Sequence, residues 1–263
     1  MNDRQQVTIG FIGFGNMASA LADGWIATGA VPAGRLYACA NRYEALCERT
    51  AARGMHALHD AAELVDAVDV VVVAIKPHLI EGVLSPLADR LAHKAVLSVA
   101  AGWDSARYEA LLPGTHHLST VPNTPVSIGE GVIACERAHT LSADEHELII
   151  GLLESVGSVV EVESRLLSVA GTVGGCGPAF IAMVIESLGD AAVKHGIPRA
   201  DAYRMVSQMV AGTAKLQLAT GQHPGAMKDA VCSPGGTTIR GVAALERAGV
   251  RSAFIQAIDA IEG

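Results

Sequence analysis

Residues 7–21 read VTIGFIGFGNMASAL, and this stretch decides how the N-terminal half of the chain folds. The compact β-branched run at residues 7–12 predicts a strand, and the apolar spacing of residues 16–28 predicts a helix that stops at Gly29. Between the strand and the helix lies the pattern GxGxxA. A glycine-rich turn that leaves a strand and opens a helix is typical of dinucleotide-binding βαβ units.

This turn suits a pyrophosphate group. Gly13 permits the tight turn, Gly15 lets a pyrophosphate approach the backbone, and Asn16 and Met17 begin a helix whose N-terminal amide groups and dipole favour an anion. We therefore predict that these four residues bind the cofactor. An ordinary turn between a strand and a helix is the alternative.

The alternation of strand and helix patterns continues to about residue 163. Further strands are predicted at residues 35–40, 55–58, 69–75, 95–99, 116–121, 131–136 and 158–162. Helices are predicted at residues 43–53, 60–66, 78–93, 104–112 and 142–156. Repeated strand–helix units predict an α/β Rossmann-type fold with a doubly wound parallel sheet.

After about residue 163 the strand patterns stop. Helical patterns then follow at residues 178–195, 199–220, 237–248 and 251–261. We predict a Rossmann domain at 1–163 and an all-helical C-terminal domain at 164–263. Because the helical part is rich in Ala, Gly, Met and Val, we expect it to bury a face against a second subunit.

The composition limits the class of protein. The chain has 263 residues, of which 50% are hydrophobic and 17% are charged, with a net charge of −8. A chain of this length and apolarity suits one large or two ordinary domains. No basic run appears in it. Because nucleic-acid binding needs a clustered basic surface, we expect no nucleic-acid partner.

Cysteine and histidine usage indicates neither a disulfide framework nor a metal site. The 5 cysteines are odd in number and lack a CxxC pair, which is typical of reduced thiols in the cytosol. The 10 histidines lack metal-binding spacing, and His116 and His117 point to opposite faces of a predicted strand. No signal-peptide pattern is found, and the longest uncharged apolar run is placed near residues 70–75, far below the ~20 residues of a membrane helix. We expect a soluble cytoplasmic protein with no membrane partner.

The residues after the second predicted strand discriminate between NAD and NADP. An NAD site places Asp or Glu there to bind the ribose 2′-hydroxyl, whereas this chain has Ala40, Asn41 and Arg42. A guanidinium attracts the 2′-phosphate of NADP, which a carboxylate would repel. We predict NADP as the cofactor, with NADPH preferred over NADH and with Asn41 and Arg42 at the 2′-phosphate. A solvated Arg42 at a helix start is the alternative.

Three more strand ends point to the same crevice, because ligands of open α/β sheets bind at the carboxyl ends of the strands. Lys76 leaves an apolar strand, small residues follow the next strand, and an Asn lies between two prolines after the third. The predicted cofactor-binding residues here are Ala74, Lys76, Pro77, Ala100, Ala101, Gly102 and Asn123. For Asn123 a purely turn-forming role is the alternative.

A second glycine-rich turn lies in CSPGGTTIRGV, residues 232–242. Pro and two Gly end the preceding segment, and two Thr begin a new helical pattern. Backbone amides of Gly236, Thr237 and Thr238 at a helix N-terminus suit an anion. From the residues alone, plain N-capping by the threonines is the alternative.

Together these stretches resemble the pyrroline-5-carboxylate reductase family over nearly the whole chain. The resemblance is carried by GFIGFGNMA, AIKPH, SVAAG, VPNTPVSIGEG, ESVGSVVEV, GCGPAF and QHPGAMKDAVCSPGGTTIRGVAALE. The last stretch is the most specific, because GxGxxA alone indicates only a dinucleotide-binding protein.

The resemblance implies a Rossmann domain followed by helices that interlace in a homodimer, with dimers assembling into larger rings. It implies NADPH-dependent reduction of the C=N bond of 1-pyrroline-5-carboxylate to L-proline, the last step of proline biosynthesis. It assigns the substrate carboxylate to Ser233, Gly235, Gly236, Thr237 and Thr238. Thr238 faces the imine nitrogen and is the predicted catalytic residue, as an orienting group rather than a strong acid.

Some residues depart from the family pattern. Gly174 and Cys176 stand in place of serines, Phe180 in place of Tyr, Ser168 in place of Asp, and Ala61 in place of an Asn near the adenosine. Cys176 has no recognisable base and is interpreted as a packed thiol.

Three other functions compete with this interpretation. One is reduction of another cyclic imino acid, such as the six-membered homologue, and another is a non-catalytic NADP-binding regulatory protein. A β-hydroxyacid dehydrogenase would need a Lys where this chain has Ile181.

Overall fold

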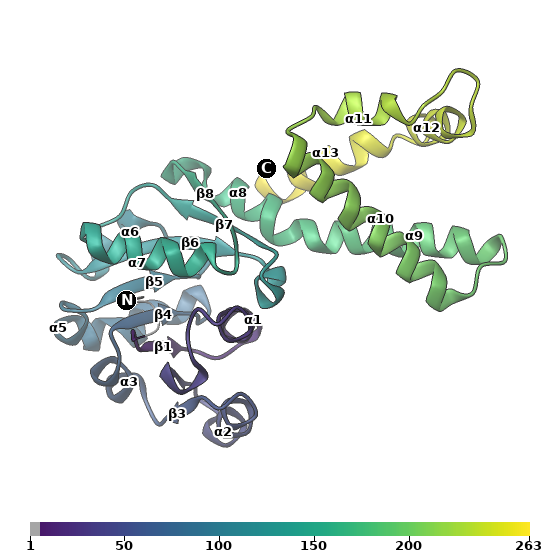
Figure 1. The fold of residues 1–263 in the computed structure, drawn as a ribbon. Helices are drawn as coiled ribbons and strands as arrows, with labels where there is room; N and C mark the ends of the chain where they lie inside the picture. Colours follow the sequence, from purple (N-terminus) through teal and green to yellow (C-terminus); the bar gives the residue numbers. More distant parts are fainter. Residues whose placement is uncertain (1–5) are drawn as a thin grey trace. The chain divides into compact units, whose positions relative to one another are not determined.

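The chain forms two compact units, Met1–Cys176 and Gly177–Gly263, in a computed structural model that describes residues 6–263. The first unit is an α/β domain and the second contains only helices (Figure 1), so the predicted fold class is confirmed. The last strand ends at Val162, next to the predicted domain boundary at residue 163. The helical turns that follow it, up to Cys176, pack with the first unit.

The first unit is built on an eight-stranded sheet with the order β3-β2-β1-β4-β5-β6-β7-β8. The strands are β1 (Ile9–Ile12), β2 (Leu36–Cys39), β3 (His56–Leu58), β4 (Val70–Val73), β5 (Ala95–Ser98), β6 (His116–Pro122), β7 (Gly131–Glu136) and β8 (Gly157–Val162). The strands from β3 to β6 are parallel, and their reversal of order between β1 and β4 is the mark of a doubly wound sheet.

One pair departs from the predicted parallel sheet. β6 and β7 are antiparallel, with Val121 opposite Ala134, whereas β7 and β8 are again parallel. Only a short 3₁₀ turn, Thr124–Ile128, connects β6 to β7. A parallel pair needs a crossover of about a dozen residues or more, so this connection can only reverse the chain.

Helices cover both faces of the sheet. Those of the first unit are α1 (Asn16–Ala27), α2 (Tyr43–Ala51), α3 (Ala61–Ala67), α4 (Ile80–Leu84), α5 (Ala88–Leu91), α6 (Ser105–Leu111), α7 (Ala143–Glu154) and α8 (Leu167–Gly171). One core contains the buried side chains of α1, α2 and α7, and the other contains those of α3 to α6. The alternate side chains of each central strand enter the two cores in turn, as expected for a sheet buried on both faces.

The single helix predicted at residues 78–93 is wrong in detail. The structure has a 3₁₀ turn Pro77–Leu79, then α4, a second 3₁₀ turn Ser85–Leu87, and α5. Pro86 lies in the break between α4 and α5. Because proline lacks an N–H and its ring clashes with the preceding turn, a regular helix cannot run through it.

The second unit is entirely helical. It consists of α9 (Gly177–Lys194), α10 (Arg199–Thr220), α11 (Pro224–Ala230), α12 (Thr237–Arg247) and α13 (Val250–Glu262). α9 packs against α10, and an added Cβ at Gly189 would lie 2.6 Å from the Tyr203 ring, so this glycine lets the two helices approach closely. The sequence prediction did not include α8 or α11. It began the long helix at residue 178, whereas a π-helical turn, Thr172–Cys176, joins α8 to α9.

One helical segment is apolar over an unusual length. Ser164–Lys194 is long and apolar enough to span a membrane, judged by length and composition alone. The placement of the longest uncharged run near residues 70–75 is therefore wrong, since residues 166–185 contain no charged side chain. Little of this segment is buried in the single chain. A large exposed apolar surface indicates contact with another molecule.

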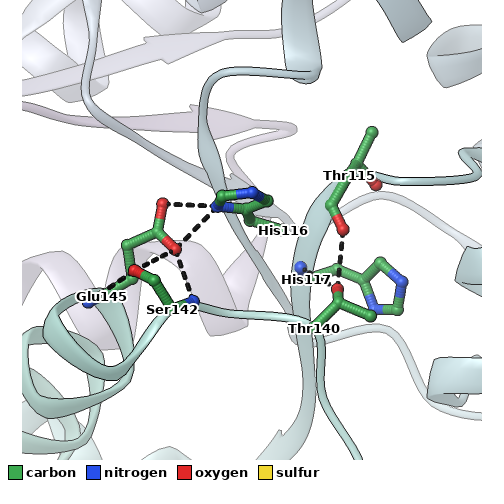
Figure 2. Close-up of polar contacts among 6 residues, drawn as sticks. All are labelled: Thr115, His116, His117, Thr140, Ser142 and Glu145. Carbon is green, nitrogen blue, oxygen red and sulfur yellow. Dashed lines mark hydrogen bonds and ion pairs between the residues drawn. The ribbon is translucent and has the colours of Figure 1, made fainter.

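β6 begins with two histidines on opposite faces, as the sequence predicts (Figure 2). His116 lies with its Nδ1 2.7 Å from Oε2 of Glu145 on α7, whereas His117 is buried and its backbone N–H donates to Thr140 Oγ1 at 2.8 Å. Burial raises the pKa of Glu145, but hydrogen bonds from His116 and Ser142 outweigh that effect and lower it overall. These contacts tie the start of β6 to α7, at the opposite end of the strand from the crevice.

Candidate active site

The turn at the carboxyl end of β1 is shaped by Gly13. Its N–H donates to the carbonyl oxygen of Cys39 at 2.9 Å, which joins the ends of β1 and β2. Its φ is +88°, and an added Cβ would lie 2.6 Å from Cγ2 of Ile75 and 2.8 Å from the carbonyl oxygen of Ala74. Only glycine fits this conformation and this spacing, as predicted for the tight turn.

Gly15 is the N-cap of α1 and leaves the helix N-terminus open. It has extended backbone, it makes no side-chain cap, and an added Cβ would meet no atom within 4 Å. Asn16 is exposed, whereas Ala18, the last position of GxGxxA, is fully buried against the core. The small third residue thus lets α1 pack on the sheet, while the first turn of α1 has no side-chain cap, as the predicted pyrophosphate contact requires.

The end of β2 presents a free guanidinium. Asn41 and Arg42 are both exposed, and within residues 6–263 Arg42 has no ion-pair partner. The next residue, Tyr43, stacks on His59, with ring centroids 4.0 Å apart. Sequence reasoning missed this aromatic pair, because its members belong to separate segments that only the pairing of β2 with β3 brings together.

The Trp103 indole connects the loops that follow β4 and β5. Nε1 of Trp103 donates to the carbonyl oxygen of Pro77 at 3.1 Å, which links the two loops that were predicted to contact the cofactor. In these loops Lys76, Pro77, Ala101 and Gly102 are exposed and Ala74 is half-buried. Ala100 is buried, with 6% exposure, and its backbone N–H and C=O are bonded to Ser98 Oγ and to the Trp103 N–H, so its predicted contact with the cofactor stays a prediction.

A buried tyrosine supports the loop after β5. The Tyr108 hydroxyl donates to Ser98 Oγ at 2.8 Å, and its ring lies 5.2 Å from the Trp103 ring. Burial raises the pKa of Tyr108 to about 12, although the contact with Ser98 acts in the opposite direction. Tyr108 therefore stays neutral at physiological pH and acts as a fixed hydrogen-bond donor beneath the loop.

Both polar groups of the Asn123 side chain are hydrogen-bonded to the protein's own backbone. Its Nδ2 donates to the carbonyl oxygen of Gly174 at 3.0 Å, and its Oδ1 accepts from the N–H of Val132 at 2.9 Å. Only 6% of the residue is exposed. This is a structural role, but not the turn-forming one considered from the sequence, because the Asn123 side chain does not cap the turn that follows it. A contact with the cofactor stays a prediction.

A cavity of about 380 Å³ lies next to the loop after β5. It is lined by two of the predicted cofactor residues, Ala101 and Gly102, by Trp103, and by Ser168 and Cys176 from the helical turns that end the first unit. Its volume is in the range of small-molecule sites. Two of the departures from the family pattern, Ser168 and Cys176, therefore line a cavity.

The second predicted anion-binding turn lies in the helical unit. Gly235 has a φ of +70°, the Gly236 N–H donates to the carbonyl oxygen of Ser233 at 3.0 Å, and Gly236 is the N-cap of α12. No side chain caps this helix, so the N-capping by threonine that was the alternative is absent, and both Thr237 and Thr238 are exposed. The structure thus leaves the α12 amides and two hydroxyls free for an anion.

Three features together define an NADP-binding oxidoreductase of the Rossmann class. They are the glycine-rich turn between β1 and α1, the absence of a carboxylate at the end of β2, and the uncapped N-terminus of α12. Comparisons with known proteins agree. Residues 8–102 match the family model described as NADP oxidoreductase coenzyme F420-dependent, and residues 164–262 match pyrroline-5-carboxylate reductase dimerisation. The second match identifies the helical unit as an oligomerisation unit.

Individual relatives narrow the class to a family. Pyrroline-5-carboxylate reductase of Treponema pallidum is 42% identical over 261 residues, which cover 97% of this chain and 98% of the relative. The chain belongs to the pyrroline-5-carboxylate reductase family. Among solved structures, the Plasmodium falciparum pyrroline carboxylate reductase with NADP bound has a TM-score of 0.88 at 26% identity, covering 98% of this chain and 96% of that one. The Coxiella burnetii pyrroline-5-carboxylate reductase has a TM-score of 0.85 at 32% identity, covering 97% and 96%.

Proposed function

We propose that this protein uses NADPH to reduce the C=N bond of 1-pyrroline-5-carboxylate to L-proline, the last step of proline biosynthesis, in the cytoplasm. The observation that carries the proposal is the pairing, in one chain of this family, of an open α1 N-terminus with an uncapped α12 N-terminus. The first suits a pyrophosphate and the second suits a carboxylate.

The cofactor is assigned to the crevice of the first unit. Gly13, Gly15, Asn16 and Met17 hold the pyrophosphate, and Asn41 and Arg42 hold the 2′-phosphate. The remaining contacts come from the loops after β4, β5 and β6, through Ala74, Lys76, Pro77, Ala100, Ala101, Gly102 and Asn123. Because Arg42 lacks an ion-pair partner within the described residues, its charge is available to a phosphate, which favours NADPH over NADH.

Bound NADPH supplies the hydride, and the protein supplies orientation. The amides of Thr237 and Thr238, with the Ser233 hydroxyl and the backbone of Gly235 and Gly236, hold the substrate carboxylate, whereas the Gly236 N–H is already bonded to the Ser233 carbonyl oxygen. The Thr238 hydroxyl hydrogen-bonds the ring nitrogen and sets the imine carbon toward the incoming hydride. Since a protonated imine is already electrophilic, holding it in place accounts for much of the catalysis.

The assembly is a homodimer formed through the helical unit, with rings of dimers as the larger form. The support is the number of large apolar side chains that are exposed in the single chain. On α9 and α10 these are Ile181, Met183, Leu188, Met205, Met209, Leu216 and Leu218. A second subunit would remove this surface from water, which explains a long apolar helix without a membrane.

A substrate panel tests the proposal. The protein is mixed with NADPH or NADH and with five-membered or six-membered cyclic imino acids, and the nicotinamide absorbance is followed. We expect the highest kcat/KM with NADPH and pyrroline-5-carboxylate. A higher value with the six-membered ring would reassign the substrate, and NADPH binding without turnover of any imine would indicate the non-catalytic alternative.

A further inference from the structure

Arg49, on α2, hydrogen-bonds to the backbone of the glycine-rich loop between β1 and α1. Its Nη1 donates to the carbonyl oxygen of Phe14 at 2.6 Å, and its Nη2 donates to Ser19 Oγ at 2.6 Å. The guanidinium carbon also lies 5.2 Å from the centroid of the Phe14 ring. Phe14 and Ser19 are both buried, with 4% and 7% exposure, so these contacts lie beneath the loop rather than on the surface.

The bond to Phe14 determines where the next amide points. A trans peptide is planar, and its C=O and N–H point in opposite directions. The described residues contain no cis peptide, so the N–H of Gly15 must point away from the carbonyl oxygen that Arg49 holds. Within residues 6–263 that N–H has no hydrogen-bond acceptor, and an added Cβ at Gly15 would meet no atom within 4 Å. Arg49 therefore fixes the direction of a free donor at the start of α1.

The positive charge of Arg49 makes the Gly15 N–H a stronger hydrogen-bond donor. A cation on the carbonyl oxygen polarises the peptide group, and linked hydrogen bonds reinforce one another. Charge-assisted bonds are also stronger than neutral ones, so the loop is held in one conformation before a ligand arrives. A preorganised loop binds more tightly because less ordering remains to be done on binding.

The position of Arg49 on α2 separates its role from that of Arg42. Arg42 is the exposed N-cap of α2, at the tip of β2, whereas Arg49 lies in the last turn of the same helix and is only half-exposed. One is exposed to solvent at the strand tip and the other contacts the loop.

We propose that Arg49 is a positioning residue for the cofactor: its guanidinium sets the Phe14–Gly15 peptide so that the Gly15 amide binds the pyrophosphate of a dinucleotide. The proposal rests on the NADP site described above, and it does not depend on which imine is reduced. Because both NADPH and NADH carry a pyrophosphate, Arg49 serves both, unlike Arg42.

Direct binding measurements test the role. NADPH, NADH and adenosine 2′-monophosphate, which has no pyrophosphate, are titrated into the wild type, Arg49→Met, Arg49→Lys and Arg53→Met. We expect Arg49→Met to raise the Kd of NADPH and NADH by the same factor, about tenfold, and to change that of adenosine 2′-monophosphate less than about twofold. Arg49→Lys keeps the positive charge but loses the paired donors of the guanidinium, so it should bind both dinucleotides more tightly than Arg49→Met does and less tightly than the wild type.

Arg53→Met is the matched control. Arg53 also lies over the Phe14 ring, at 5.8 Å, but its hydrogen bonds go to Asp23 and to the Arg49 carbonyl oxygen and not to Phe14. We expect this variant to lose thermal stability and to retain the wild-type Kd for both dinucleotides.

Three outcomes would overturn the proposal. An unchanged NADPH Kd in Arg49→Met with a lower Tm would leave Arg49 with a structural role only. Weaker binding of NADPH but not NADH would mean that it contacts the 2′-phosphate, and equal weakening of adenosine 2′-monophosphate would mean a general disturbance of the site. If Arg49→Met does not fold, the same comparison is made with Arg49→Lys. Failure of imine reduction would not affect these measurements, since no substrate is used.

Discussion

Nδ2 of Asn123 donates a hydrogen bond of 3.0 Å to the carbonyl oxygen of Gly174, 51 residues further along the chain. The bond ties the loop after β6 to the π-helical turn at the end of the first unit. Through its Oδ1, the same side chain also holds Val132, at the start of β7. The buried Asn123 carboxamide thus connects the loop after β6, the start of β7 and the π-helical turn, all within the unit that contains the predicted cofactor site.

Replacing Asn123 should cost stability. Asn123→Ala leaves the Val132 N–H and the Gly174 carbonyl without their partner, which should lower the free energy of unfolding by roughly 2 kcal/mol. Urea denaturation measures the change, and Asn41→Ala, at an exposed Asn, should stay within about 0.5 kcal/mol of the wild type. Unchanged stability in Asn123→Ala together with a raised NADPH Kd would favour the direct cofactor contact instead.

Two glycines in helices should respond to alanine in opposite ways. A Cβ at Gly24, on α1, would lie 2.1 Å from the carbonyl oxygen of Val126, which is too close for any contact. Gly24→Ala must push apart α1 and the turn after β6, so we expect destabilisation by about 3 kcal/mol or more. Thermal unfolding of the purified variant, or its absence from the soluble fraction, would reveal this.

The matched control is Gly82→Ala on α4. No atom lies within 4 Å of an added Cβ at Gly82, and the residue is exposed. Alanine has a higher helix propensity than glycine, so this variant should be more stable by up to about 1 kcal/mol. If both variants lost similar stability, the close contact at Gly24 would not be the cause.

Removing the Thr238 hydroxyl should affect catalysis more than cofactor binding. Thr238→Ala should lower kcat with pyrroline-5-carboxylate about tenfold or more, because the imine loses an orienting hydrogen bond, while the NADPH Kd stays within about twofold. Thr238→Ser keeps the hydroxyl and should retain most of the activity. Wild-type turnover in Thr238→Ala would remove the assigned role.

Arg42 should discriminate between the two dinucleotides. In Arg42→Ala the KM for NADPH should rise at least tenfold, whereas the KM for NADH should change less than about twofold, because only NADPH carries the 2′-phosphate. Steady-state kinetics at fixed substrate concentration provide both values. Equal increases would show that Arg42 does not contact the 2′-phosphate.

Stability should fall as the solution becomes acidic, partly because of His117. Burial lowers the pKa of His117, although Glu109 acts in the opposite direction. Below its ordinary pKa of 6.5 the unfolded chain binds a proton that the folded protein excludes, so stability that is present at neutral pH is lost as the pH falls through 6.5. His139 has a pKa lowered by burial as well and contributes in the same direction.

Unfolding curves from about pH 7.5 to about pH 5.5 check this prediction. The Tm of the wild type should decrease over this range, and that of His117→Gln, which keeps a polar side chain without a titrating group, should decrease less steeply. Parallel curves for the two proteins would show that His117 does not titrate on unfolding.

Much of the fold was predictable because its signals are local. GxGxxA between a strand and a helix located the crevice, and the loss of strand patterns after residue 163 matches the end of the sheet at Val162. The antiparallel β6–β7 pair and the break at Pro86 were missed, although a short connection and a proline were visible in the sequence. α8 and the π-helical turn were missed because a glycine-rich apolar run has no clear helical period.

The candidate site was only partly predictable. The glycines, Arg42 and the turn from Ser233 to Thr238 lie where strand ends and helix starts place them, so their positions follow from local pattern. The Tyr43–His59 stack, the hold of Arg49 on Phe14 and the cavity beside Trp103 each join segments that are distant in sequence. No spacing rule connects such residues.

By itself the sequence determined the alternation of strands and helices as far as Val162, the position of the two glycine-rich turns and the choice between NAD and NADP. These properties depend on hydrophobic period, on glycine, and on the charge at one strand end, all of which are read within a few residues. Only the tertiary structure decided that Asn123 is occupied by backbone and that Arg49 is directed at the loop. Both depend on which strands pair and how closely helices pack on them, and such long-range contacts arise from the whole core rather than from any one segment.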